Sequence, residues 1–536
     1  MRKYQFITVV QMVFIIQVAC KQDKIVEDLS KIERIVVSSP KTNILFDGSE
    51  TNYKLTAKAY SSNGNLITDI KFDWQSSNTT VASVNQDGLV TILGGGSTNI
   101  SATFEGITDD VDINVVTPFE GGNTLFKNVS VVDVESGTVI EAQNVLVHND
   151  KIVEIGSSST SIPDNTKVID GMGKYLMPGI TDAHVHVVLQ SDFIKYLYNG
   201  ITSVIDMGFP STRSDPPPVL DWKREIIAGV IDGPNYYPSI MIRGPQDNGR
   251  VVVSNSNEAR IAVDSHKDFD FIKAYSLVPR DAFLALADEG KKYKLSVIGH
   301  GNRNMGLQSI LESGQVMIAH AEEYLYTFYS GIQPDRTQEA INLTLNAGAY
   351  VTATLSTYEA ISKVWGQNNA GYSELLQRPG YEYLDQSYKT RWENQYLNVF
   401  NQPGSLHQNL VFQREFVKEF NDAGIPLLLG TDSPGIVGQH AGFSIHEEIR
   451  NLSEAGLDNT SILKIATMNF GDFVKQHSRY DEDFGQVKIN YRSDLILLSN
   501  NPLEDLNTLK HPLGVMVRGK WYGESTLQSL LDELKK

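Results

Sequence analysis

The stretch PGITDAHVH, residues 178–186, decides the fold prediction for this sequence. It has the pattern of a short apolar strand that ends in two histidines, His184 and His186, with one residue between them. Side chains at alternate positions of a strand point to the same side, so both imidazoles can reach one point. Because neutral imidazole is a common ligand of divalent transition metals, the pair predicts half of a metal site. The alternative is two surface histidines at the end of a strand.

Around this strand, residues 178–484 alternate short apolar strands with segments of helical pattern. The predicted strands include Thr202–Asp206, Phe271–Ala274, Leu295–Ile298, Val316–Ala319, Val351–Thr354 and Pro426–Leu429. Roughly 300 residues of such alternation predict a (β/α)8 TIM barrel with insertions. The active site of such a barrel lies at the carboxyl ends of its strands, so residues with useful chemistry are expected there.

Four further residues with metal-binding or acid–base chemistry stand at those strand ends. They are Lys273, His300, His320 and Asp432. One strand-terminal histidine is usually structural. Together with His184 and His186, however, these residues occupy five strand ends in order, and this arrangement predicts one shared site.

The segments on either side of the predicted barrel, residues 124–177 and 485–523, are rich in short β-strand patterns. We predict that they pair into one β-sandwich domain that flanks the barrel, since the termini of a domain often lie close together. The predicted fold class is therefore α/β.

Residues 31–117 have an all-β pattern, with short apolar runs separated by turn signals such as Asp87-Gly88. The run Trp74–Thr91 resembles the bacterial immunoglobulin-like repeat of surface proteins. One interpretation is a domain that adheres to a glycan or a protein. The alternative, which we favour, is a spacer, because the segment contains no histidine and no evident cluster of catalytic groups.

Residues 1–20 have the pattern of a secretory signal, in which Arg2 and Lys3 precede an apolar run too short to span a bilayer comfortably. The run ends at Cys20, the only cysteine of the chain, and resembles a bacterial lipoprotein signal in which that cysteine is lipidated. This predicts secretion across the inner membrane and a cell-envelope lipoprotein, periplasmic or on the surface, that meets the membrane only through its anchor. The alternative is an ordinary cleaved signal with an incidental cysteine. A single cysteine excludes an intrachain disulfide and a zinc site built from several thiolates.

The net charge of the chain argues against one class of binding partner, nucleic acid. The 536 residues include 46 basic and 64 acidic side chains, a net charge of −18. This acidic excess argues against nucleic acid, whose phosphates require lysine and arginine. The length predicts about two to four domains.

These motifs resemble the amidohydrolase superfamily of metal-dependent hydrolases, over residues 124–522. The matching motifs are Pro178–His186, Asn199–Asp206, Asp270–Lys273, His300, Ala319-His320, Gly430–Asp432, Ala466-Thr467 and Ser493–Leu495. In detail the sequence is similar to the imidazolonepropionase- and prolidase-like branch, some of whose members cleave dipeptides.

The resemblance implies a centre of two divalent metal ions, with zinc as the first choice. His184 and His186 would bind one metal, and His300 and His320 the other. Lys273 would be carboxylated to N6-carboxylysine and bridge the two; the alternative is an unmodified lysine in an ion pair. Asp432 would bind metal and act as general base on the water that the metals activate as hydroxide.

The implied activity is hydrolysis of an amide or peptide C–N bond in a small molecule such as a dipeptide or an N-acyl amino acid. The alternatives are a mononuclear deaminase or cyclic-amide hydrolase, and a surface binding protein with an inactive barrel. Deaminase relatives carry a glutamate shortly after the fifth-strand histidine, whereas His300 is followed by Gly301–Asn304, which contains no acid. We therefore favour hydrolysis over deamination.

The candidate substrate-binding residues are Tyr275, Arg243 and His440. In prolidase-like relatives a tyrosine near the position of Tyr275 contacts the substrate carboxylate. Arg243 is a candidate partner for an anion, and His440 for an oxyanion or a carboxylate; each is equally compatible with a structural role. The aromatic segment after Leu355 is expected to be a lid or a substrate-binding element, or else a self-packed excursion or a contact in a homo-oligomer.

Overall fold

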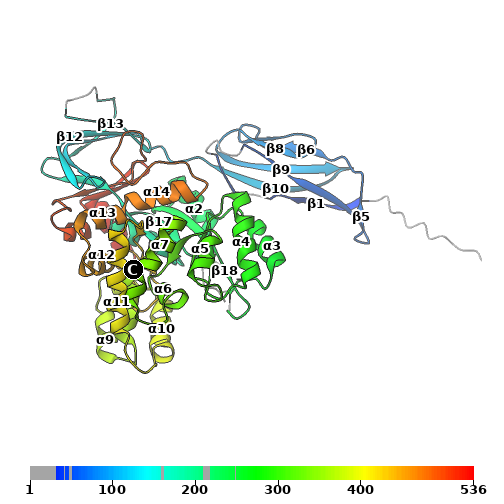
Figure 1. Cartoon of the computed structure of the whole chain (residues 1–536). Coiled ribbons are helices and arrows are strands. Elements are labelled where there is room, and N and C mark those ends of the chain that lie inside the picture. The colour runs from blue at the N-terminus through cyan, green and yellow to red at the C-terminus, as the bar shows by residue number, and fades with distance from the viewer. Residues whose placement is uncertain are drawn as a thin grey trace, which may run out of the picture. The chain divides into compact units, whose positions relative to one another are not determined.

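The structure is a computed structural model, and it describes residues 32–40, 43–46, 51–157, 162–208, 218–247 and 249–535. The predicted signal peptide, with Cys20, lies outside the described residues. The chain divides into two compact units, with the boundary between Val115 and Val116 (Figure 1). Among the described residues, no helix is both long enough and apolar enough to cross a membrane.

The N-terminal unit is built only from strands within its described part. They are β1 (Ile32–Ser38), β2 (Asn43–Leu45), β3 (Asn52–Lys54), β4 (Thr56–Ser61), β5 (Leu66–Ile67), β6 (Asp73–Ser76), β7 (Ala82–Val84), β8 (Leu89–Ile92), β9 (Gly96–Phe104) and β10 (Ile107–Val116). They form three sheets, with the orders β1-β4-β5, β2-β10-β9-β6 and β3-β8-β7. Inward-facing residues such as Ile100 and Ala102 alternate with outward-facing ones and pack around Trp74. The predicted all-β N-terminal region is therefore confirmed.

The two segments that flank the barrel in sequence form one eight-stranded sheet. Its strands are β11 (Asn123–Asp133), β12 (Thr138–His148), β13 (Lys151–Gly156), β14 (Lys167–Asp170), β15 (Tyr175–Pro178), β25 (Leu495–Leu498), β26 (Gly514–Val517) and β27 (Lys520–Gly523). The halves meet where β15 pairs antiparallel with β25, so that Pro178 lies opposite Leu495. Phe126, Leu497 and Met516 belong to its core. The first barrel strand, β16, thus begins directly after an inner strand of this sheet, since β15 lies between β11 and β25.

The middle of the chain forms a nearly closed barrel of eight parallel strands, as the sequence predicts. They are β16 (Ile180–Val185), β17 (Ile201–Asp206), β18 (Asn235–Arg243), β20 (Phe271–Ala274), β21 (Val297–Gly299), β22 (Gln315–Ala319), β23 (Tyr350–Thr352) and β24 (Leu427–Leu428), with the short β19 (Val251–Val252) beside β18. The first and last strands are joined by backbone hydrogen bonds from Ala183 N to Leu429 O (2.7 Å) and from Asp432 N to His184 O (2.7 Å).

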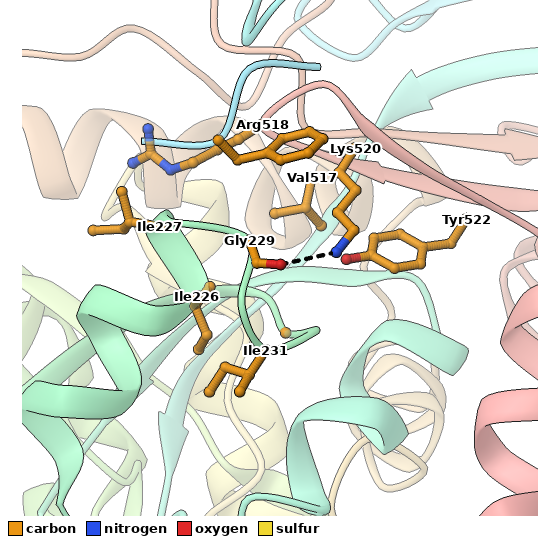
Figure 2. Close-up of a pocket in the computed structure, with 10 residues that line it drawn as sticks. Ile226, Ile227, Gly229, Ile231, Val517, Arg518, Lys520 and Tyr522 are labelled. Carbon is orange, nitrogen blue, oxygen red and sulfur yellow. Dashed lines mark hydrogen bonds between the residues drawn. The ribbon is translucent and has the colours of Figure 1, made fainter. Parts of the chain in front are cut away.

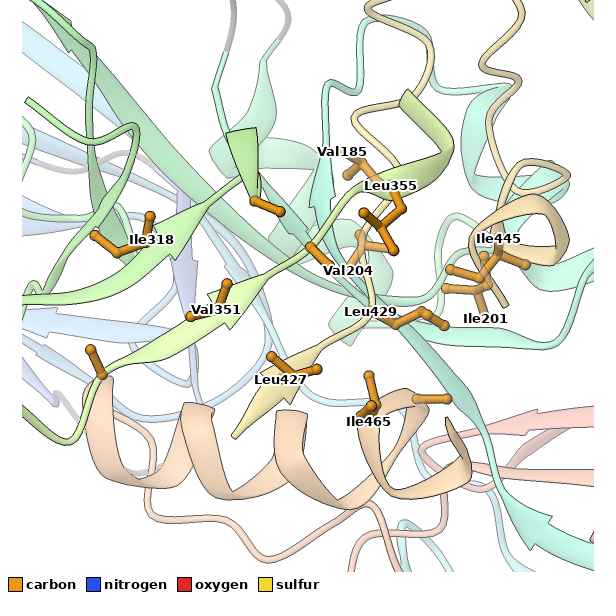
Figure 3. Packing of buried hydrophobic residues seen from close by; sticks show 14 of the residues in the cluster. Val185, Ile201, Val204, Ile318, Val351, Leu355, Leu427, Leu429, Ile445 and Ile465 are labelled. Atoms are coloured by element: carbon orange, nitrogen blue, oxygen red, sulfur yellow. The ribbon is translucent and has the colours of Figure 1, made fainter. Parts of the chain in front are cut away.

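Helices cover the outside of the barrel. They are α1 (Asp192–Tyr198), α2 (Val219–Ile227), α3 (Ser256–Ser265), α4 (Arg280–Tyr293), α5 (Leu307–Glu312), α6 (Glu322–Thr327), α7 (Thr337–Ala347), α8 (Leu355–Val364), α9 (Asn369–Leu375), α10 (Gln386–Asn394), α11 (His407–Asp422), α12 (Ile445–Glu454), α13 (Asn459–Ala466), α14 (Met468–His477) and α15 (Glu524–Glu533). Figure 3 shows how strand residues such as Leu427 and Leu429 pack with helix residues such as Ile465.

The interior of the barrel is apolar at the amino ends of the strands. Phe271 begins β20 and Tyr350 begins β23, and both pack against Phe473 of α14. Because side chains two apart on a strand share a face, Lys273 points to the same side as Phe271 but lies nearer the carboxyl end. The aromatic plug therefore leaves only the carboxyl end of the interior for polar groups.

The aromatic segment after Leu355 forms α8, α9, α10 and a π-helical turn at Gln395–Val399. It packs around its own core, which includes Trp392 and Tyr388 and which it shares with Val437 of the loop after β24. Trp392 Nε1 donates to the carbonyl oxygen of Pro434 (3.4 Å), and Gln395 Nε2 to that of Gly435 (3.0 Å). The excursion is thus self-packed, and it also covers the loop that follows Asp432.

The segment that precedes β11 is anchored to the barrel unit. The backbone N–H of Phe119 donates to the carbonyl oxygen of Ile227 (2.8 Å), and its ring centre lies 5.6 Å from Lys520 Nζ. Figure 2 shows the small pocket there, in which Lys520 Nζ also donates to the carbonyl oxygen of Gly229 (3.3 Å). These contacts tie the start of the barrel unit to the end of α2 and to β27.

Candidate metal centre

The four histidines predicted from the strand ends lie together at the carboxyl end of the barrel. The ring centres of His184 and His186 are 5.4 Å apart, those of His184 and His320 are 4.5 Å apart, and those of His300 and His320 are 4.9 Å apart. Ligand atoms of His184, His186 and Asp432 all lie within 4.8 Å of one another. Residues from β16, β21, β22 and the end of β24 therefore converge on one place.

The hydrogen bonds of His186 and His320 show which ring nitrogen of each is protonated. Nδ1 of His186 lies 2.6 Å from the carbonyl oxygen of Gly208, which can only accept, so Nδ1 donates. Nδ1 of His320 lies 2.8 Å from Oγ1 of Thr354, and this hydroxyl donates its own hydrogen to the carbonyl oxygen of Ala353 (2.9 Å). Nδ1 of His320 therefore donates as well. In neutral rings, both Nε2 atoms are then left with the lone pair that a metal requires.

The ring of His300 is fixed by contacts on one face and at its Nδ1 atom. The ring of Tyr275 stacks on it with a centre-to-centre distance of 4.4 Å. Its Nδ1 lies 2.8 Å from Oγ of Ser276 and 3.1 Å from Oε1 of Glu323, so only Nε2 is free to face the site. Glu323 is the second residue of α6, the helix that follows His320, and is fully buried. Sequence reasoning missed it because it considered only the residues that directly follow His300.

Asp432 faces two histidines through one oxygen. Its Oδ1 lies 2.9 Å from Nε2 of His186 and 3.2 Å from Nε2 of His184. Burial lowers the pKa of His184 well below its usual range, so this ring is neutral. With Nδ1 of a neutral His186 protonated, a lone pair faces a carboxylate oxygen, and a cation between them relieves this repulsion.

At the strand ends, two of the buried groups that lack a hydrogen-bond partner in the described part of the chain fit a metal centre. They are the two ring nitrogens of His184 and Nζ of Lys273. A buried polar atom without a partner costs about 1–3 kcal/mol, which a bound cation or a modification would offset. Burial also lowers the pKa of Lys273 to about 8, so that a neutral amine is accessible near neutral pH. The donor set of imidazole and carboxylate groups is suited to zinc or a similar divalent metal.

The backbone is strained at the strand ends that carry these groups. His320 has φ +71°, Asp432 has φ +55° and Thr354 has φ +48°, all in the left-handed region that side chains other than glycine rarely adopt. Such strain costs roughly 1–3 kcal/mol at each residue and is typical of functional sites. Asp182 holds one of these turns, since its Oδ1 accepts from the N–H groups of His184 and Thr431 (both 3.1 Å). Its role was not predicted from the sequence.

The predicted substrate-binding residues lie in two places. Arg243 stacks over Tyr275, with 3.9 Å between its guanidinium carbon and the ring centre, and both therefore adjoin His300. His440 packs against Trp392 at a ring-centre distance of 5.0 Å, in the covered loop after β24. Both its ring nitrogens are buried and lack a hydrogen-bond partner in the described part of the chain. The role of His440 in substrate binding stays a prediction.

Comparison with known families decides the identity of the barrel unit. The sequence model of the amidohydrolase family matches residues 175–522, more than half of the chain. The chain belongs to the amidohydrolase family. As a member it is a hydrolase of carbon–nitrogen bonds, in a family that generally binds divalent metals. The model of the intimin immunoglobulin-like domain matches residues 55–105, so both predicted resemblances are confirmed.

Solved structures share the fold of this amidohydrolase at low sequence identity. A putative prolidase from Bifidobacterium longum is 22% identical over 78% of this chain and 100% of its own, with a TM-score of 0.56. A bottromycin amidohydrolase is 21% identical over 77% and 90% of the two chains, with a TM-score of 0.60. A Xaa-Pro dipeptidase with bound methionine is 18% identical over 75% and 100%, with a TM-score of 0.54. No curated protein matches this sequence significantly.

The close packing at Gly299 predicts that Gly299→Ala weakens metal binding. Gly299 has φ +115°, and a Cβ there would lie 2.5 Å from Cδ of Lys273 and 2.7 Å from the carbonyl oxygen of Ala274. The displaced Lys273 and His300 would hold a metal at least about tenfold less tightly. Elemental analysis of the metal bound per chain measures this.

Gly314→Ala is the matched control. Gly314 has φ +93°, but no other residue's atom lies within 4 Å of its added Cβ, so only the backbone is strained. We expect a loss of about 1–2 kcal/mol in stability with unchanged metal content. Equal metal content in both variants would show that the position of Lys273 does not matter for binding.

Proposed function

We propose that this amidohydrolase hydrolyses an amide or peptide bond in a small molecule, a dipeptide or an N-acyl amino acid, at a centre of two divalent metal ions. One observation carries the proposal: several buried groups at the strand ends lack the partner that a metal would provide. The ring nitrogens of His184 and Nζ of Lys273 have no hydrogen-bond partner among the described residues, and Nε2 of His186 faces Oδ1 of Asp432 at 2.9 Å. His184 and His186 would hold one metal, and His300 and His320 the other. When bound, such metals polarise a substrate carbonyl and lower the pKa of water from about 15.7 toward about 7.

Asp432 is the general base of the proposed reaction. Its Oδ1 faces Nε2 of His186 (2.9 Å) and of His184 (3.2 Å). It accepts the proton of the attacking water and passes it to the nitrogen of the leaving amine as the C–N bond breaks. Its positive φ and the hydrogen bond from its N–H to His184 O hold the carboxylate in a fixed direction.

Lys273 is proposed to carry a carboxyl group on Nζ. The lone pair of the neutral amine attacks the carbon of CO2, a C–N bond forms, and the amine loses one proton to solvent. A buried cation without a partner thereby becomes an anion with two oxygen ligands, which suits a place between two metals. Its burial and its lowered pKa support this step.

Tyr275 and Arg243 are proposed to bind the substrate carboxylate. The guanidinium of Arg243 lies over the ring of Tyr275, which itself stacks on His300, so a positive charge adjoins the reacting centre. The names of two structural neighbours, a putative prolidase and a Xaa-Pro dipeptidase, favour a substrate of this class. His440 is proposed to meet the substrate from the covered loop, through the two nitrogens that lack partners.

Asp432→Asn tests the hydrolase proposal. Replacing the base should lower kcat by about 10²–10⁴-fold on the substrate that the wild type cleaves, because the proton of water then has no acceptor. The measurement is a panel of dipeptides and N-acyl amino acids, with amine release as the signal. Asp422→Asn, at an exposed aspartate of α11, is the control and should leave the rate unchanged. Two metals per chain without turnover of any substrate would favour the inactive-barrel alternative, and one metal per chain the mononuclear one.

Lys273→Ala tests the carboxylated lysine. The variant should lose metal and activity, since a bridging anion is missing. Acetate or propionate should restore part of both, because a small carboxylate can occupy the vacated volume and supply the two oxygens. The mass of the intact wild-type chain under native conditions should exceed that of the acid-treated chain by one CO2. Failure of rescue together with an unmodified mass would contradict the carboxylation while leaving the hydrolase proposal intact.

We also propose that Cys20 is lipidated and that the mature chain is a cell-envelope lipoprotein. The sequence of the first 20 residues supports this, with two basic residues, an apolar run and the single cysteine at its end. Cys20→Ser should move the protein from the detergent phase to the aqueous phase on phase separation, because acyl chains supply the membrane affinity. An unchanged distribution would contradict lipidation at this residue.

A further inference from the structure

The carboxylate of Glu323 stands behind His300, on the side away from the proposed metals. Its Oε1 lies 3.1 Å from Nδ1 of His300 and 3.1 Å from a terminal nitrogen of Arg303. The glutamate is fully buried, and Oε2 has no hydrogen-bond partner among the described residues. A buried charge persists only when it is paired, and here its neighbours are a guanidinium and one imidazole N–H.

The second neighbour of Nδ1, the hydroxyl of Ser276 at 2.8 Å, cannot by itself decide the tautomer of His300. A hydroxyl both donates and accepts, so it is compatible with a hydrogen on either ring nitrogen. Oε1 of Glu323 already accepts a hydrogen bond from Arg303 (3.1 Å), and an oxygen that acts as an acceptor favours a hydrogen on Nδ1. In the neutral ring this leaves the lone pair on Nε2.

We propose that Glu323 is a positioning residue for the metal centre: from α6, the helix after β22, it sets the tautomer and the ring orientation of His300 on β21. This inference rests on the proposed function, in which His300 binds a metal through Nε2. Nδ1 of each of His186, His300 and His320 thus faces a polar partner away from the proposed metals: Gly208 O, Glu323 together with Ser276, and Thr354.

The location of Glu323 also bears on the type of reaction. A deaminase needs an acid that reaches the substrate, whereas this carboxylate is fully buried and faces Nδ1 of His300 and Arg303. The geometry thus assigns it to the support of a ligand and not to proton transfer with a substrate.

The experiment measures metal affinity and not activity alone. The full chain is stripped with a chelator and titrated with Zn(II) against a chromogenic competitor, for the wild type and for Glu323→Gln. The amide has almost the same shape but no charge, and it can present a donor to Nδ1. We expect one of the two zinc ions to bind about 10–100-fold more weakly, the usual result of losing such a partner.

Two matched variants separate positioning from general destabilisation. Glu359→Gln removes another buried carboxylate that pairs with arginines, Arg378 at 3.1 Å and Arg450 at 2.6 Å, and should bind zinc as the wild type does. Ser276→Ala removes the hydroxyl but keeps Glu323, and should change zinc affinity by less than threefold. The melting temperatures of the stripped proteins report the structural cost of each change.

Three outcomes would overturn the inference: unchanged zinc affinity in Glu323→Gln, an equal loss in Glu359→Gln, or a tenfold loss in Ser276→Ala. The last outcome counts even if Glu323→Gln does not fold. A wild-type chain that binds no zinc would instead contradict the proposed metal centre itself, so the two failures are distinguishable.

Discussion

The site depends on one constraint: nitrogen and oxygen lone pairs of buried side chains face one another at the carboxyl end of the barrel. Nε2 of His186 and Oδ1 of Asp432 lie 2.9 Å apart, and Nε2 of His184 lies 3.2 Å from the same oxygen. In a low dielectric this arrangement is repulsive unless positive charge lies among the acceptors. The protein holds it because each contributing backbone is fixed by the barrel. A divalent cation bound among these atoms would replace the repulsion between them with attraction to the cation. The geometry is therefore best explained as a metal centre.

The barrel separates two kinds of interior. Aromatic side chains fill the amino ends of the strands, where Phe271 and Tyr350 pack on Phe473, and the polar groups occupy the carboxyl ends. The seam between β16 and β24 lies beside the site, and Asp182 accepts backbone hydrogen bonds from both sides of it. The left-handed conformations of His320 and Asp432 persist because the packed strands around them leave no alternative. The packing of the barrel therefore holds the proposed ligands in backbone conformations that would otherwise be unfavourable.

Local patterns explain what could be predicted from the sequence. The alternation of strands and helices, and the histidines at strand ends, depend on neighbours in the chain, and topology alone brings such ends together. Glu323, Thr354 and Asp182 could not be predicted in the same way, because each acts on a residue of another strand. Their partners depend on side-chain directions and on backbone turns with positive φ. The search for an acid near His300 failed for this reason, since the acid comes from the helix after the following strand.

The excursion between β23 and β24 shows how specificity can vary without loss of the centre. It has its own apolar core, and it contacts the barrel through the loop that follows Asp432, by hydrogen bonds to the carbonyl oxygens of Pro434 and Gly435. Substitutions within it can therefore move the wall around His440 while the ligands stay in place. His186 and His320 are oriented by Gly208 O, after β17, and by Thr354, at the start of α8, and not by α9 or α10. The proposed metal ligands thus lie at the barrel strand ends, whereas the excursion contributes the wall around His440.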